Sequence, residues 1–75
     1  MEMSRIVGNN VRFLRESKLY SQESFAKKAG FKRTYIGAVE RGEMNLTLSN
    51  LCQLANALGV HPCILLIDNA FKKEK

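Results

Sequence analysis

Three glycines, Gly30, Gly42 and Gly59, divide the sequence into short segments with helical periodicity. Glycine reaches the positive φ that closes many helices without steric cost, so each of the three marks the end of a helix. We expect five helices, over about 4–18, 21–30, 32–42, 47–59 and 61–71. No segment shows the strict apolar alternation of a strand. Because the connections are only about two to five residues long, the sequence predicts a compact all-α fold of five helices.

The expected helix starts carry residues that cap helices. Ser4, Ser21 and Thr47 each precede an apolar run, and a hydroxyl there can accept a hydrogen bond from the first turn. His61 stands at the start of the fifth segment, followed by Pro62 at a position where its missing N–H costs nothing. The inner faces then carry apolar residues at helical spacing: Ile6, Val7, Val11, Leu14, Phe25, Ala26, Ala29, Leu48, Leu51, Leu54, Ala55 and Leu58.

The positive charge is concentrated in one half of the chain. The 75 residues have a net charge of +5, and residues 1–42 hold nine Lys/Arg against four Asp/Glu. Residues 43–75 hold three of each, so the whole excess lies in the first 42 residues. This asymmetry fits a polyanionic partner, and it equally fits a role in solubility alone. A chain of this length makes one domain, residues 1–75, in which we expect 72–75 to be a frayed tail.

Other classes of protein find little support in the composition. One histidine, no glycine-rich phosphate loop and no pair of carboxylates in a plausible cleft argue against an enzyme. Cys52 and Cys63 are too few and too far apart for a zinc site, so we expect reduced thiols and neither metal nor cofactor. No apolar run approaches the roughly 18 residues of a membrane span, and the N-terminus lacks the apolar core of a signal peptide. We therefore expect a cytoplasmic protein.

Residues 22–41 have the form of a helix-turn-helix. Ala26 is small where two helices must cross closely, and Gly30 can make the sharp turn between them. The apolar contacts that would fix this crossing come from Phe25, Phe31, Ile36 and Val39. Such a pair of helices places the second one in the major groove of DNA.

The whole chain resembles a Cro/CI-type (XRE-like) helix-turn-helix domain, the class of the lambdoid phage repressors. The resemblance is carried by "SQESFAKKAGF", "RTYIGAVERGEMNLTLSNLCQLANALGV" and "CILL". The portion "RTYI…ERG…NLTL" further resembles the controller proteins of restriction–modification systems. The resemblance implies a sequence-specific transcription regulator of double-stranded DNA that binds a palindromic operator as a homodimer, controls its own expression and needs no small-molecule ligand. Two dimers on adjacent operators are one arrangement, and an antitoxin or phage-type repressor acting partly through a protein partner is the alternative.

The helical wheel of the second helix of this motif separates an inner from an outer side. Ile36, Val39 and Glu40 fall on the inner side. Gly37 falls on the outer side, where we expect close approach of its backbone to DNA. The residues expected to read bases are Arg33, Thr34, Tyr35 and Ala38.

An inward carboxylate at Glu40 needs a partner. The family pattern has an Arg–Glu pair at the positions of Arg15 and Glu40, so the resemblance implies an ion pair between the first and third helices. Many members add an acid where this chain has Ser24, a departure that leaves the pair less well neutralised. The residues expected to contact the DNA backbone are Gln22, Lys32, Arg41, Asn45 and Thr47.

The fifth segment contains more apolar residues than one inward face can bury. We assign Leu65 and Leu66 to the core, and Cys63, Ile64 and Ile67 to a two-fold dimer interface. The alternative is that all of them pack internally. A dimer suits the function, because one short recognition helix reads too few base pairs to be specific.

Overall fold

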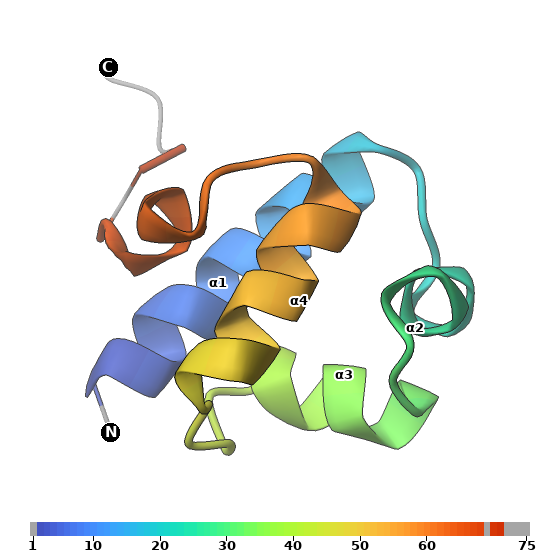
Figure 1. Ribbon diagram of the computed structural model, residues 1–75, viewed down its shortest axis with the longest axis horizontal. Coiled ribbons are helices and arrows are strands. Elements are labelled where there is room, and N and C mark those ends of the chain that lie inside the picture. The colour runs from blue at the N-terminus through green and yellow to red at the C-terminus, as the bar shows by residue number, and fades with distance from the viewer. Residues whose placement is uncertain (1, 69, 72–75) are drawn as a thin grey trace.

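Four α-helices and one short 3₁₀ helix make up the computed structural model, which describes residues 2–68, 70 and 71 (Figure 1). Their bounds are α1 Glu2–Ser17, α2 Gln22–Ala29, α3 Arg33–Glu40, α4 Leu48–Leu58 and η1 Pro62–Leu66. The described residues contain no strand, so the all-α prediction is confirmed. The tail expected over 72–75 lies outside the described residues.

The helices are arranged around α1 and α4, which lie against each other in the centre of the molecule (Figure 1). The pair α2 and α3 stands on one side of this centre, and η1 packs on the other side. α3 runs along the lower edge of the view, so one of its sides faces away from the other helices. This arrangement places the second helix of the helix-turn-helix on the outside of the molecule.

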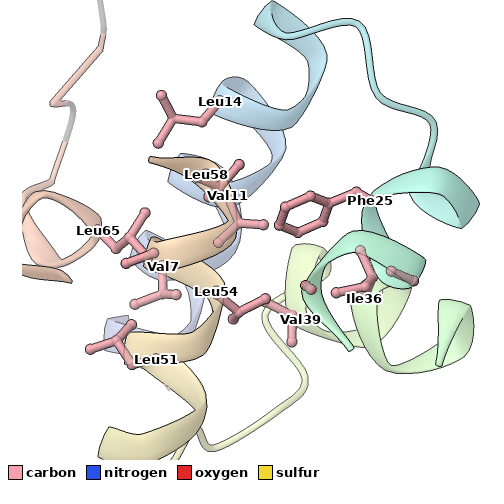
Figure 2. Close-up of a cluster of buried hydrophobic side chains, with 13 residues drawn as sticks. Val7, Val11, Leu14, Phe25, Ile36, Val39, Leu51, Leu54, Leu58 and Leu65 are labelled. Carbon is pink, nitrogen blue, oxygen red and sulfur yellow. The ribbon is translucent and has the colours of Figure 1, made fainter. Parts of the chain in front are cut away.

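Side chains from all five elements meet in one hydrophobic core (Figure 2). The ring of Phe25 points from α2 toward Val11 of α1, and both are completely buried. Burial of such a side chain stabilises the fold by roughly 1.5–3 kcal/mol. The core is made of Val7, Val11, Leu14, Phe25, Ala26, Ala29, Ile36, Val39, Leu51, Leu54, Ala55, Leu58 and Leu65.

Local capping explains where α2 and α4 begin. Ser21 Oγ accepts a hydrogen bond from the Ser24 N–H at 3.0 Å, and Ser24 Oγ accepts one from the Ser21 N–H. Thr47 Oγ1 likewise accepts from the Asn50 N–H at the start of α4. By contrast, Lys32 precedes α3 without a side-chain hydrogen bond to the helix. α3 therefore has only eight residues and no such cap, so its stability must come from packing.

The start of the first helix differs from the prediction. α1 begins at Glu2, so Ser4 is not its N-cap but lies buried within the helix. Ser4 Oγ donates to Asn45 Oδ1 at 3.5 Å, which connects α1 to the segment before α4. The acidic Glu2 lies in the first turn, where a negative charge interacts favourably with the helix dipole.

The prediction of a fifth α-helix reaching Phe71 was wrong. The chain forms only the 3₁₀ helix η1 and becomes extended at Ile67, with φ −92° and ψ 118°. The Asn10 side chain of α1 explains this ending, because its Nδ2 donates to the carbonyls of Leu65 at 2.9 Å and Ile67 at 3.0 Å. Those carbonyls are thereby paired without further helical turns. Leu65 is fully buried as expected, whereas Leu66 is 40% exposed and does not belong to the core.

Gly8 allows α1 and α3 to approach closely. A Cβ atom at this position would overlap the Val39 carbonyl oxygen and lie 3.0 Å from the Glu40 carbonyl oxygen. Both are backbone atoms at the end of α3, so they cannot move aside as a side chain could. Gly8 thus brings the end of α3 close enough to α1 for the contacts described below.

We expect the substitution Gly8→Ala to destabilise the protein, although alanine is the better helix former. The methyl group must push α3 away from α1, and overpacking of this kind costs about 1–3 kcal/mol. Urea unfolding followed by circular dichroism measures the change. Gly37→Ala is the matched control, because its Cβ would meet no backbone atom but only the ends of two long side chains, Arg41 Nη1 at 3.2 Å and Gln22 Oε1 at 3.8 Å. That variant should gain about 1 kcal/mol from helix propensity. Equal stability of the two variants would contradict the role assigned to Gly8.

Candidate nucleic-acid interface

The two sides of α3 differ sharply in burial. Ile36 is fully buried and Val39 is 1% exposed, and both belong to the core. Lys32, Arg33 and Thr34 are exposed at the opposite side of the helix start. α3 runs along an edge of the molecule (Figure 1), which is consistent with the exposure of these three residues. A basic and hydroxyl-bearing helix start therefore faces outward.

An ion pair holds the end of α3 to α1. Arg15 Nε lies 2.6 Å from Glu40 Oε2, and Arg15 Nη2 lies 3.1 Å from Glu40 Oε1. The two side chains are only 9% and 4% exposed. The hydrogen bond to Glu40 raises the pKa of Arg15 above its usual value, so the guanidinium stays charged at every accessible pH. Arg15 Nη1 also donates to the Tyr20 carbonyl, which adds the α1–α2 loop to the same anchor.

Gln22 connects this ion pair to the exposed start of α3. Its Nε2 donates to Glu40 Oε1 at 3.0 Å, so the amide oxygen points the other way and accepts from Arg33 Nη1 at 3.1 Å. The carboxylate thus receives a third hydrogen bond from α2, although Ser24 offers no acid there. An unbroken chain of hydrogen bonds therefore runs from Arg15 through Glu40 and Gln22 to Arg33. The sequence showed no sign of it, because it depends on how the three helices cross.

Gly37 is buried, although the helical wheel places it on the outer side of α3. The space that its side chain would occupy is bounded by Arg41 Nη1 at 3.2 Å and Gln22 Oε1 at 3.8 Å. Long side chains from α2 and from the end of α3 therefore cover this backbone. The expectation that Gly37 is exposed was wrong, whereas close approach of its backbone to DNA stays a prediction.

Tyr35 is fixed from two directions. Its hydroxyl oxygen accepts a hydrogen bond from Asn50 Nδ2 of α4 at 3.0 Å. Its ring stacks on Phe31, with centroids 4.7 Å apart and an interplanar angle of 26°. Beside these rings lies a shallow hollow lined by Gly30, Phe31, Lys32, Thr34, Tyr35, Ala38, Met44 and Asn50. Asn50 is a residue of this surface that the sequence did not reveal.

The residues expected to contact the DNA backbone lie around α3, and four of the five are already hydrogen-bonded within the protein: Gln22, as described above, and Arg41, Asn45 and Thr47. Arg41 Nε donates to Glu43 Oε2 at 3.0 Å, which raises the pKa of Arg41 and lowers that of Glu43. Asn45 accepts from Ser4, and Thr47 caps α4. Arg41, Asn45 and Thr47 are all exposed, so the solvent-facing parts of their side chains are accessible to a ligand.

The residues assigned to a dimer interface lie in and just after η1. Cys63 is exposed as a free thiol and Ile67 is 49% exposed, whereas Ile64 is half-buried against the core. An apolar hollow of about 320 Å³ lies nearby, between α1, the segment before α4 and η1. Its lining includes Leu66, so this residue belongs to the exposed apolar surface.

Comparisons with known proteins agree with this geometry. Residues 11–65 match the HTH_3 family, described as helix-turn-helix, and the chain belongs to this family. It is similar to the control protein C.SmaI of Serratia marcescens, with 44% identity over 75 residues that span 100% of this chain and 89% of that protein. The prediction of a Cro/CI-type regulator resembling controller proteins is thereby confirmed.

Solved structures share the fold. The restriction–modification controller protein C.AhdI from Aeromonas hydrophila is 40% identical, with a TM-score of 0.81 over 87% of this chain and 98% of that one. The hypothetical transcription factor NHTF from Neisseria is 41% identical, with a TM-score of 0.84 over 88% of this chain and 76% of that one. The protein is a helix-turn-helix transcription regulator homologous to restriction–modification controller proteins. No helix among the described residues is long and apolar enough to cross a membrane.

We expect Glu40→Ala to destabilise the fold by about 3 kcal/mol or more, because it leaves the buried Arg15 guanidinium unpaired. Thermal or urea unfolding measures this loss. Glu43→Ala is the matched control, since it breaks the exposed pair with Arg41 and should leave stability nearly unchanged. A melting temperature for Glu40→Ala close to that of the wild type would rule out a structural role for the pair.

Proposed function

We propose that the protein is a sequence-specific regulator of transcription that binds a palindromic operator in double-stranded DNA as a homodimer. It acts as the controller protein of a restriction–modification system and regulates its own expression. The observation that supports this proposal is that the two sides of α3 differ. Ile36 and Val39 are buried and anchor the helix, whereas Arg33 and Thr34 are exposed at its start. In helix-turn-helix proteins, the start of the second helix meets the base edges in the major groove.

The exposed side chains of α3 have the chemistry that base reading requires. Arg33 can donate two hydrogen bonds to O6 and N7 of a guanine, and its link to Gln22 occupies only Nη1. Thr34 can offer its hydroxyl to a base or a phosphate and its methyl group to a thymine. Ala38 is half-buried and short, which lets the helix enter the groove and contact a thymine methyl. We assign base readout to these residues together with Tyr35.

The surrounding polar residues hold the protein on the DNA backbone. Lys32 precedes α3, Arg41 follows it, and Asn45 and Thr47 lie in the segment before α4; all four are exposed. The pair between Arg41 and Glu43 is exposed, so exchanging the carboxylate for a phosphate costs little. Gln22 stands at the first position of α2, where the backbone N–H groups and the remaining amide hydrogen can face a phosphate. The net charge of +5 supports the same docking.

We assign the dimer interface to the exposed apolar surface formed by Cys63, Ile64, Leu66 and Ile67. Two copies related by a two-fold axis read two half-sites, which gives the specificity that one short helix lacks. Residues 1–75 act as one domain in this scheme. Occupancy of the operator then follows the concentration of the protein, because monomers dimerise and dimers bind by mass action.

A mobility shift assay on the DNA upstream of the protein's own gene tests operator binding. We expect the wild type to prefer this DNA over random DNA and to lose affinity steeply with salt, because phosphate contacts release counterions. Arg33→Ala should lower discrimination at one base pair of each half-site by about 1–3 kcal/mol. Lys28→Ala is the matched control, since it removes one charge from the exposed side of α2 and should weaken operator and random DNA alike. Equal affinity of the wild type for both DNAs would refute the proposal.

Sedimentation equilibrium tests the dimer. We expect the wild type to be dimeric at micromolar concentrations and Ile67→Glu to shift it toward monomer, because a charge would be buried in the interface. Leu19→Glu is the control, since Leu19 is also apolar and 92% exposed but lies between α1 and α2. A wild type that remains monomeric at tens of micromolar would contradict the proposed interface.

A further inference from the structure

The hollow beside α3 contains a hydroxyl that is hydrogen-bonded to a side chain of α4. Tyr35 Oη accepts from Asn50 Nδ2 at 3.0 Å, and no other partner of this oxygen occurs among the described residues. We propose that Asn50, a residue of α4 outside the helix-turn-helix, is a positioning residue that makes the Tyr35 hydroxyl a hydrogen-bond donor toward an acceptor atom of DNA. This inference rests on the proposed function, because it assumes that the surface around α3 binds DNA.

The donor assignment follows from counting hydrogen bonds. A phenol carries one O–H donor and two acceptor lone pairs. The asparagine N–H can only donate, so it occupies a lone pair and leaves the phenolic proton free to turn toward solvent. The partner of that proton must be an acceptor. Phosphate oxygens and the O6, N7 and O4 atoms in the major groove are acceptors, whereas the exocyclic amines of adenine and cytosine are donors.

The position of this hydroxyl is also restricted. Phe31 stacks on the Tyr35 ring, so the ring cannot swing away from α3 without losing that contact. Asn50 lies in the first turn of α4, where its backbone N–H is held by Thr47 Oγ1 at 3.0 Å. The hydroxyl is therefore held between the start of α3 and the start of α4. A donor held in this way needs little further ordering when DNA binds.

A simpler view is that the hydrogen bond between Asn50 and Tyr35 only stabilises the fold. The two views differ in how the residues depend on each other in DNA binding. If Asn50 acts through the Tyr35 hydroxyl, its removal matters for binding only while that hydroxyl is present. If Asn50 is merely structural, its removal has the same effect on binding with tyrosine or phenylalanine at position 35.

A double-mutant cycle separates these views. The full chain carries Tyr35→Phe, Asn50→Ala or both, and binding is measured on the upstream DNA and on random DNA of equal length. We expect Tyr35→Phe to weaken binding about three- to tenfold, the range for one hydrogen bond. Asn50→Ala should weaken binding less, because it loosens the hydroxyl without removing it. It should have no further effect once Tyr35→Phe is in place.

A substitution that reverses the direction of the hydrogen bond between position 50 and Tyr35 gives a stricter test. In Asn50→Asp the carboxylate accepts the phenolic proton, so the hydroxyl can no longer donate outward, and binding should fall at least as much as in Tyr35→Phe. Ser49→Asp is the matched control, since it adds the same charge at the neighbouring exposed position of α4. A loss with Asn50→Asp that equals the loss with Ser49→Asp would overturn the inference, as would an Asn50→Ala effect independent of Tyr35.

The two DNAs identify the acceptor. If Tyr35→Phe weakens binding equally on upstream and random DNA, the acceptor is a phosphate. If the loss of affinity is confined to the upstream DNA, the acceptor is a base edge.

The Asn50 amide resonances in NMR spectra test the contact between Asn50 and Tyr35 without DNA, and their chemical shifts should change on Tyr35→Phe. Unchanged resonances would overturn the inference even if the wild type prefers its operator. A wild type without any operator preference would contradict the proposed function itself.

Discussion

The ion pair between Arg15 and Glu40 sets the position of α3, and the outward surface of that helix depends on it. α3 has eight residues, a glycine near its middle and no side-chain hydrogen bond at its start, so it would be marginal in isolation. Packing of Ile36 and Val39 and the near-buried ion pair supply the stability that the segment lacks. Because Ile36, Val39 and Glu40 supply the anchoring contacts, Lys32, Arg33 and Thr34 at the start of α3 remain exposed.

The nearly buried Glu40 carboxylate is tolerated because its oxygens accept hydrogen bonds from neighbouring side chains. The Glu40 carboxylate accepts two hydrogen bonds from Arg15 and one from Gln22. This last contact determines which end of the Gln22 amide faces Arg33, because the donor end is taken by the carboxylate. The orientation of an exposed arginine thus depends on a buried acid, and the two cannot be treated as independent sites.

The elements that the sequence predicted well are those whose ends depend on neighbouring residues. α2 and α4 begin after Ser21 and Thr47, and they end at Gly30 and Gly59 with φ 84° and 72°. Such caps are readable because each involves residues three or four positions apart.

Most of the features that the sequence did not reveal involve residues far apart in the chain. Nothing in "CILLID" indicates that Asn10 will take the carbonyls of Leu65 and Ile67, so periodicity suggested a longer helix. A helical wheel gives the direction of Gly37 but not the long side chains that cover it. Gly8 reads as an unremarkable helix residue until the end of α3 is placed against it. The family resemblance indicated the class of site, whereas its hydrogen bonds follow from the crossing of helices.

α1 contacts both α3 and η1, the elements to which we assign DNA binding and dimerisation. Gly8 and Arg15 fix α3 on one side of it, and Asn10 holds the end of η1 on the other. In a dimer joined through η1, the separation of the two α3 helices would therefore be set by the body of α1 and not by a flexible loop. The distance between the two half-sites that such a dimer can bind would then be fixed by the rigid protein. An operator lengthened by one base pair would have to be deformed to fit, because the protein could not adjust.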